Sequence, residues 1–79
     1  DFPGAIKILE KALEYKENEG LIHYLLADVH CRMGETDAAL DLLKKAIQKD
    51  KNFSVLAQNE PDFEPLWDDK KFKLITKLA

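Results

Sequence analysis

The chain has 79 residues, of which 46% are hydrophobic and 34% are charged, and its formal net charge is −3. This length allows one domain, and the apolar content argues against a disordered chain. The mildly acidic charge disfavours nucleic-acid binding, the single cysteine excludes an internal disulfide, and no apolar run approaches the roughly 20 residues of a membrane span.

Residues 1–19 are predicted to form the first helix. Apolar residues recur there with the spacing of one helical face. These residues are Ala5, Ile6, Leu9, Ala12 and Leu13. Pro3 suits the first turn of this helix, where a backbone N–H has no helical partner in any case.

The second predicted helix follows Gly20, which we expect in the turn before it. Its apolar stripe is formed by Ile22, Leu26, Val29 and Met33. Gly34 can take the left-handed conformation that ends a helix. Thr36 is then the expected N-cap of a third helix, with Asp37 adding favourable negative charge in its first turn.

The third predicted helix repeats the first. Its apolar face consists of Ala39, Leu40, Leu43, Ala46 and Ile47. When residues 1–19 are shifted by 34 positions, Ala5 falls on Ala39, Leu9 on Leu43 and Ala12 on Ala46. A period of 34 residues is typical of a repeat made of two helices and a turn. A bulky residue at Ala39 should push the packed helices apart, because they approach to about 8–10 Å.

Residues 20–53 resemble one complete tetratricopeptide repeat. The residues that fit the family pattern are Leu26, Ala27, Ala39 and Ala46, with Leu43 in the aromatic position. The chain departs from the pattern where Trp, Tyr and Pro are replaced by His23, His30 and Lys51. The resemblance implies an all-α fold of antiparallel helix–turn–helix repeats, forming the end of an α-solenoid with about five helices. Residues 1–19 then read as the second helix of an incomplete repeat, and we expect the chain to be a fragment of a larger protein with further repeats upstream.

Residues 54–79 do not follow the period of 34. A short helix is expected at 53–58, followed by an acidic loop in which Pro61 and Pro65 exclude a continuous helix. Asp68 or Asp69 can cap a final helix. The apolar face of that helix is expected to hold Phe72, Ile75 and Leu78.

This end of the chain resembles the closing segment of many tetratricopeptide proteins, in which an acidic, proline-containing loop leads into a last helix. The residues that carry the match are Asp62, Phe63, Pro65, Leu66, Asp69 and Phe72. The resemblance implies a capping role, in which Phe63, Leu66 and Trp67 cover the open apolar face of the last repeat. An exposed Trp67 would also suit a binding hot spot.

The sequence suggests no metal site or catalytic group. His23, His30 and Cys31 match no zinc spacing, and the adjacent His30 and Cys31 point about 100° apart on a helix. We therefore expect both histidines to be half-buried packing residues. The chain is accordingly expected to need no cofactor and to be no enzyme.

Two charged groups at the C-terminal end have simple interpretations. Glu60, Asp62 and Glu64 alternate as at the start of a calcium loop, but Pro65 stands where that loop needs a glycine. Capping and solvation are expected instead. A further group, Lys70, Lys71 and Lys73, is expected to be a solvated helix face balanced by nearby aspartates, with phosphate or acidic-lipid contact as the alternative.

The resemblance also implies a concave groove lined by the first helix of the complete repeat. The groove positions are then Leu21, Tyr24, Asp28, Cys31 and Arg32. An aromatic ring, a carboxylate and a guanidinium on one side suit a peptide or helix of a partner. Asp28 and Arg32 could alternatively form only a surface pair. Repeats that bind chaperone tails use Lys and Asn on the groove side, and here those places hold Tyr24 and Asp28. Because Asp28 would repel a carboxylate tail, this repeat is not expected to be a carboxylate clamp.

The expected function is therefore a protein–protein interaction module, a scaffold or assembly factor that binds a peptide or helix of a complex subunit. The alternatives are a structural C-terminal cap of a longer solenoid and an accessory domain fused to an enzyme. The chain is expected to be intracellular and soluble, in the cytoplasm or in an organelle, because it lacks a signal peptide and a membrane span.

Overall fold

The structure is a computed structural model, and it describes residues 1–77. In chain order its elements are α1 (Phe2–Leu13), α2 (Glu19–Arg32), α3 (Thr36–Lys49), α4 (Asn52–Asn59), the 3₁₀ helix η1 (Pro61–Leu66) and α5 (Lys70–Thr76). No strand occurs within these residues, which confirms the predicted all-α class. Leu78, expected on the apolar face of the last helix, lies outside the described residues.

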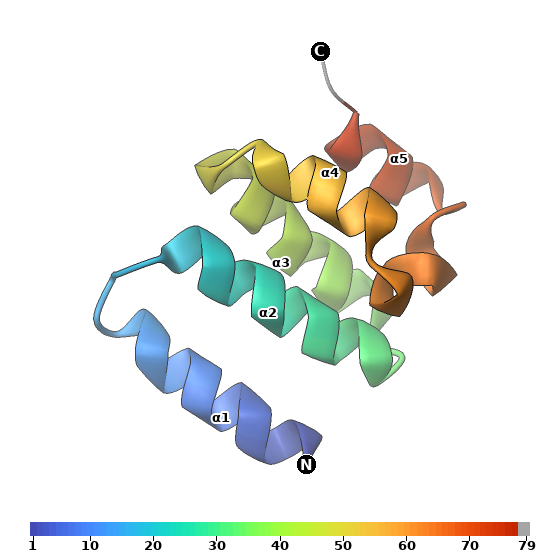
Figure 1. Cartoon of the computed structure of the whole chain (residues 1–79). Coiled ribbons are helices and arrows are strands. Elements are labelled where there is room, and N and C mark those ends of the chain that lie inside the picture. The colour runs from blue at the N-terminus through green and yellow to red at the C-terminus, as the bar shows by residue number, and fades with distance from the viewer. Residues whose placement is uncertain (78–79) are drawn as a thin grey trace.

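The first four helices lie side by side in chain order, each antiparallel to the one before (Figure 1). The contact between α2 and α3 is the most extensive in the fold. The chain then turns back, so that η1 packs on α2 while α5 packs on α3 and α4. This arrangement is the predicted stack of helix–turn–helix units with a different closing segment.

The turn between α2 and α3 is a Schellman motif. Gly34 has a φ of 83°. The Glu35 N–H donates to the His30 carbonyl at 2.9 Å, and the Gly34 N–H donates to the Cys31 carbonyl at 3.0 Å. The expected N-cap at Thr36 is wrong, because Thr36 is already the first residue of α3 and Glu35 precedes it. The motif uses Glu35 for its closing bond, so the next helix begins directly after it.

Gly20 was expected in a turn, and this expectation is also wrong. Gly20 is a buried residue inside α2. A Cβ atom there would lie 3.0 Å from the Cβ of Lys49 and 3.1 Å from a ring carbon of Phe53. The glycine therefore permits a close approach between α2, the end of α3 and the start of α4. The left-handed conformation before α2 is taken by Asn18, with a φ of 52°.

The core lies between α2, α3, α4, η1 and α5. Its buried residues are Ala27, Cys31, Ala39, Leu40, Leu43, Ala57, Phe63, Leu66 and Phe72. Alanines at the helix contacts have no exposed surface, which keeps the helix axes close. Helix α1 contributes no buried residue.

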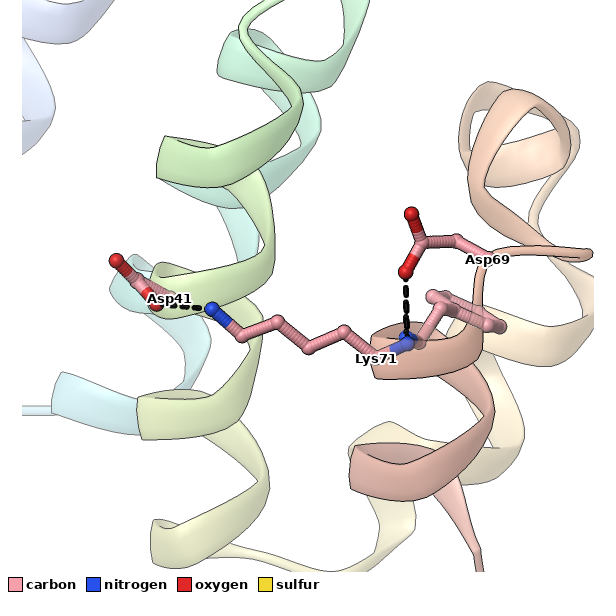
Figure 2. Close-up of polar contacts among 4 residues, drawn as sticks. Asp41, Asp69 and Lys71 are labelled. Carbon is pink, nitrogen blue, oxygen red and sulfur yellow. Dashed lines mark hydrogen bonds and ion pairs between the residues drawn. The ribbon is translucent and has the colours of Figure 1, made fainter.

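The final helix is fixed at its N-terminus and tied to α3 (Figure 2). The Asp69 carboxylate accepts hydrogen bonds from the backbone N–H of Lys71 at 2.7 Å and of Phe72 at 3.2 Å. The Lys71 ammonium donates to Asp41 of α3 at 2.8 Å. Of the two predicted caps, Asp69 is therefore the one that acts.

Candidate functional site

One side of α2 is open and partly apolar. Leu21 and Leu25 lie one turn apart and are 46% and 40% exposed. Arg32 is exposed near the end of the same helix. Because these residues are spaced by four and seven positions, they lie on one face of α2.

Tyr24 forms the edge of this open face. Its ring stacks on Phe53 of α4 with centroids 5.0 Å apart, and it meets Phe63 of η1 edge-to-face at 5.5 Å. These are favourable geometries for aromatic pairs. Burial, together with the charges of Glu60, Asp28 and Asp62, raises the pKa of the Tyr24 hydroxyl to about 12. Tyr24 is thus a neutral residue that joins three elements.

A group of three carboxylates lies beside Tyr24. Asp28 of α2, Glu60 and Asp62 each place an oxygen within 4.8 Å of the other two. Glu60 also accepts a hydrogen bond from the Asp62 backbone N–H at 3.0 Å, which caps η1. Most of the segment predicted as an acidic loop is therefore the 3₁₀ helix η1, and its start brings negative charge directly against α2.

The carboxylates change the protonation of Asp28. Burial raises the pKa of Asp28 to about 6, with further contributions from a hydrogen bond with Asp62 and from the charges of Asp62 and Glu60. The charge of Arg32 opposes this rise. Hard cations prefer such oxygen ligands. Protonation of Asp28 below about pH 6 relieves part of the repulsion within this group.

Cys31 lies under the start of η1. The Cys31 thiol donates to the Asp62 carbonyl at 3.2 Å. Burial, followed by the charges of Asp28 and Asp62, raises the pKa of the thiol. A thiol with a raised pKa is a poor nucleophile, so this residue packs rather than reacts.

The two histidines and Arg32 make local contacts. His30 Nδ1 lies 2.7 Å from a carboxylate oxygen of Glu35, an ion pair when the imidazole is protonated. His23 and His30 are both half-buried, as their family positions implied. The guanidinium of Arg32 lies over the ring of Phe2 in α1, 5.2 Å from its centroid, which is a cation–π contact.

The structure therefore divides the five predicted groove residues. Tyr24, Asp28 and Cys31 come together where η1 crosses α2, whereas Leu21 and Arg32 lie on the open part of the helix. Leu25 and Glu60 belong to the same surface, and sequence reasoning missed both. The spacing of Leu25 one turn after Leu21 could have identified it, but no local signal places Glu60 against α2.

The predicted closing segment packs by its apolar residues. Phe63, Leu66 and Phe72 are buried, while Pro65 is exposed. Trp67 is half-buried, and its indole N–H donates to the Ala57 carbonyl at 3.0 Å. The Asp62 carbonyl accepts the hydrogen bond from Cys31, and the Asp69 carboxylate caps α5. The segment thus covers the end of the core.

The comparisons with known proteins agree with this architecture. A family model described as tetratricopeptide repeat matches residues 1–59. No curated protein and no solved structure gives a significant match to the chain. Within the described residues, no helix has the length and apolar character needed to cross a membrane. The chain therefore belongs to the tetratricopeptide repeat family, whose members are in general protein–protein interaction modules and typically non-catalytic.

Proposed function

We propose that the open face of α2 binds a short helix or extended peptide of a partner protein. In this proposal, apolar side chains of the partner lie on Leu21 and Leu25, and a basic side chain of the partner lies near Asp28. The observation that carries the proposal is the pair of leucines exposed one turn apart on the helix that lines the groove in this family. Apolar anchors at this spacing suit helical or extended partner segments.

The charges beside the leucines define the class of partner. Asp28, Glu60 and Asp62 form an acidic edge, which repels the carboxylate tail of a chaperone. Arg32 is exposed at the far end of the face and can pair with an acidic residue of the partner. The preferred segment is therefore apolar with one basic residue, and the repeat is not a carboxylate clamp.

Display of random peptides against the full chain, followed by affinity measurements on the selected peptides, tests this proposal. The double variant Leu21→Ser, Leu25→Ser should weaken binding about tenfold or more, because it removes the apolar anchors. The control Ile8→Ser changes a residue of α1 that is 70% exposed, and it should leave the affinity unchanged. Equal affinities for the double variant and the wild type would contradict the proposal.

A second candidate function is that of a structural cap. It is supported by Phe63 and Leu66, which are 0% and 2% exposed and close the end of the core. Deletion of residues 59–79 separates the two functions by circular dichroism and peptide binding. Loss of helicity without loss of the selected peptides favours the cap. Loss of those peptides while helicity is retained contradicts it.

The contacts between the helices also support a division of the chain into three segments. In this proposal residues 20–53 are a complete repeat, residues 1–19 are the second helix of an incomplete one, and residues 54–79 are the closing segment. The lack of buried residues in α1 supports the assignment of residues 1–19. The contacts of η1 with α2, and of α5 with α3 and α4, support the assignment of residues 54–79 as the closing segment.

A further inference from the structure

A hollow of about 400 Å³ lies where α4, η1 and α5 meet. One wall comes from Gln58 of α4 and from Trp67, the residue that follows η1. The remaining lining comes from Phe72, Lys73 and Thr76 of α5 and from Lys77, the residue that follows it. Its volume is in the range of about 300–1,000 Å³ that is usual for ligand pockets.

The floor of this hollow is apolar and held in place. The Trp67 indole N–H is bonded to the Ala57 carbonyl, and the Gln58 amide donates to the Thr76 carbonyl at 3.0 Å. The Thr76 hydroxyl donates to the Phe72 carbonyl at 2.7 Å. Because these polar groups are bonded within the fold, the floor presents the half-buried Trp67 ring as preformed apolar surface, with the buried Phe72 ring beneath it.

Three lysines surround this apolar floor. Lys70, Lys73 and Lys77 are spaced as i, i+3 and i+7, so they share one side of α5. A second hollow of about 320 Å³ lies beside the first, and both are lined by Lys73 and Lys77. The second hollow also includes Leu74, which is 72% exposed. The two hollows therefore form one surface, named here the α5 surface, which is apolar below and positive at its rim.

The lysines of this rim have no paired carboxylate among the described residues. Within residues 1–77, no carboxylate lies within 4.0 Å of the ammonium groups of Lys70, Lys73 or Lys77. Lys71 points the other way and pairs with Asp41 (Figure 2). The Asp69 carboxylate is engaged in capping α5. Three lysines without a paired carboxylate, set beside an apolar floor, suit a negatively charged ligand.

We propose that the α5 surface binds an acidic segment of a partner protein. A large apolar side chain of that segment lies on Trp67, while its carboxylates pair with Lys70, Lys73 and Lys77. A free phosphate would satisfy the lysines but would leave the apolar floor uncovered. The open face of α2 is bordered by carboxylates, so the two surfaces select segments of opposite charge.

Trp67 provides a direct measurement, because it is the only tryptophan of the chain and lies in the hollow. The probe is an acetylated, amidated peptide of sequence Asp-Glu-Asp-Phe-Asp-Glu-Asp, titrated while Trp67 fluorescence is recorded. A saturable change below about 1 mM is expected. A matched peptide with Ser in place of Phe should bind about tenfold more weakly, because it lacks the apolar anchor.

Charge variants test the rim. Lys73→Glu with Lys77→Glu should weaken binding of the peptide about tenfold or more. The matched control is Lys7→Glu with Lys11→Glu on α1, which makes the same charge change at the same spacing and should alter the affinity less than about twofold. Circular dichroism establishes that both variants fold. If Trp67 does not respond, or if both double variants lose the same affinity, the proposal is overturned.

Acidic lipid is the competing source of negative charge. Phosphatidylcholine vesicles with about one third phosphatidylserine present it in a second titration. If these vesicles change the Trp67 fluorescence and the peptide does not, the surface is a lipid contact and the proposal is overturned. A response to the peptide that depends on its Phe, with no response to vesicles, supports the proposal.

Discussion

Helices α1 and α3 carry related residues in unlike surroundings. Leu9 of α1 corresponds to Leu43 of α3 across the 34-residue period, and Ala5 corresponds to Ala39. Leu43 and Ala39 have no exposed surface, whereas Leu9 and Ala5 are only half-buried. The same apolar face is therefore a core element in α3 and a partly open one in α1.

The difference comes from the neighbours of each helix. Helix α3 packs against α2, α4 and α5, while the main contact of α1 is with α2 (Figure 1). The repeat pattern specifies which side of a helix is apolar. The burial of that side, and with it the contribution to stability, is decided by how many elements cover it.

The largest expected difference in stability is between alanine variants of Leu43 in α3 and Leu9 in α1. Leu43→Ala should lower the free energy of unfolding by about 3 kcal/mol, because it leaves a cavity in a closed site. Leu9→Ala should lower it by about 1 kcal/mol, since part of that side chain already contacts solvent. Urea unfolding followed by circular dichroism measures both. Similar losses for the two variants would show that α1 is as well covered as α3.

Leucine variants of the equivalent alanines, Ala39 and Ala5, should show a second, smaller difference in stability. Ala39→Leu adds volume at a fully buried position of the core, and it should lower the unfolding free energy by about 2 kcal/mol. Ala5→Leu adds the same volume to a half-open face, and it should change stability by less than about 0.5 kcal/mol. The same urea measurement applies. An equal cost at both positions would contradict the comparison.

Weakening the N-terminal cap of α5 should leave the apolar face of α3 less well covered, as that of α1 is. Asp69→Ala removes the side chain that accepts two backbone hydrogen bonds at the start of α5, and it should lower the unfolding free energy by about 1 kcal/mol. The control is Asp68→Ala, an exposed neighbour outside the cap, with an expected change below about 0.5 kcal/mol. Thermal unfolding followed by Trp67 fluorescence distinguishes the two variants. No loss in Asp69→Ala would mean that α5 does not need its cap.

The smallest expected effect depends on pH and concerns α2, which is the neighbour of both helices. The pKa of Asp28 is raised from 3.8 to about 6 in the folded chain. The folded state therefore holds this proton more tightly than the unfolded state, so the Asp28 contribution to stability falls as pH rises from about 4 to about 6.

Asp28→Asn removes this titration. Relative to the wild type, the variant should gain stability between about pH 4 and pH 6 and keep the gain above it. Urea unfolding at several pH values measures the difference. Asp62→Asn should reduce the effect, because the Asp62 carboxylate contributes to the raised pKa of Asp28. A constant difference between Asp28→Asn and the wild type at all pH values would contradict the assignment.

Local signals predicted most of the fold. The periods of apolar residues identified the helices, and the left-handed glycine at position 34 marked the turn between α2 and α3. Gly20 was misplaced because a glycine near a helix start can serve either a turn or a close contact, and only the packing against Lys49 and Phe53 decides between them. Thr36 was misplaced because helix bounds shift easily by one residue.

The candidate site was less predictable, because it depends on contacts between distant parts of the chain. The family resemblance placed Tyr24 and Asp28 on a groove-lining helix, but it did not indicate that Glu60 and Asp62 would lie against them. More than thirty positions separate these pairs along the chain, and helical periodicity carries no information over such a distance. The hollow beside the lysines of α5 could not be predicted for the same reason, since it also requires Gln58 and Trp67 from other parts of the chain.

The bond from the Trp67 indole to the Ala57 carbonyl has a consequence for the order of folding. Helices α4 and α5 have 8 and 7 residues, fewer than the roughly 12–15 at which isolated helices are even marginally stable in water. The Trp67 bond, together with that from Gln58 to Thr76, joins α4 to the segment that follows it. We therefore expect α2 and α3, with their local contacts, to form the folding nucleus, and the two short helices to gain structure together after the rate-limiting barrier.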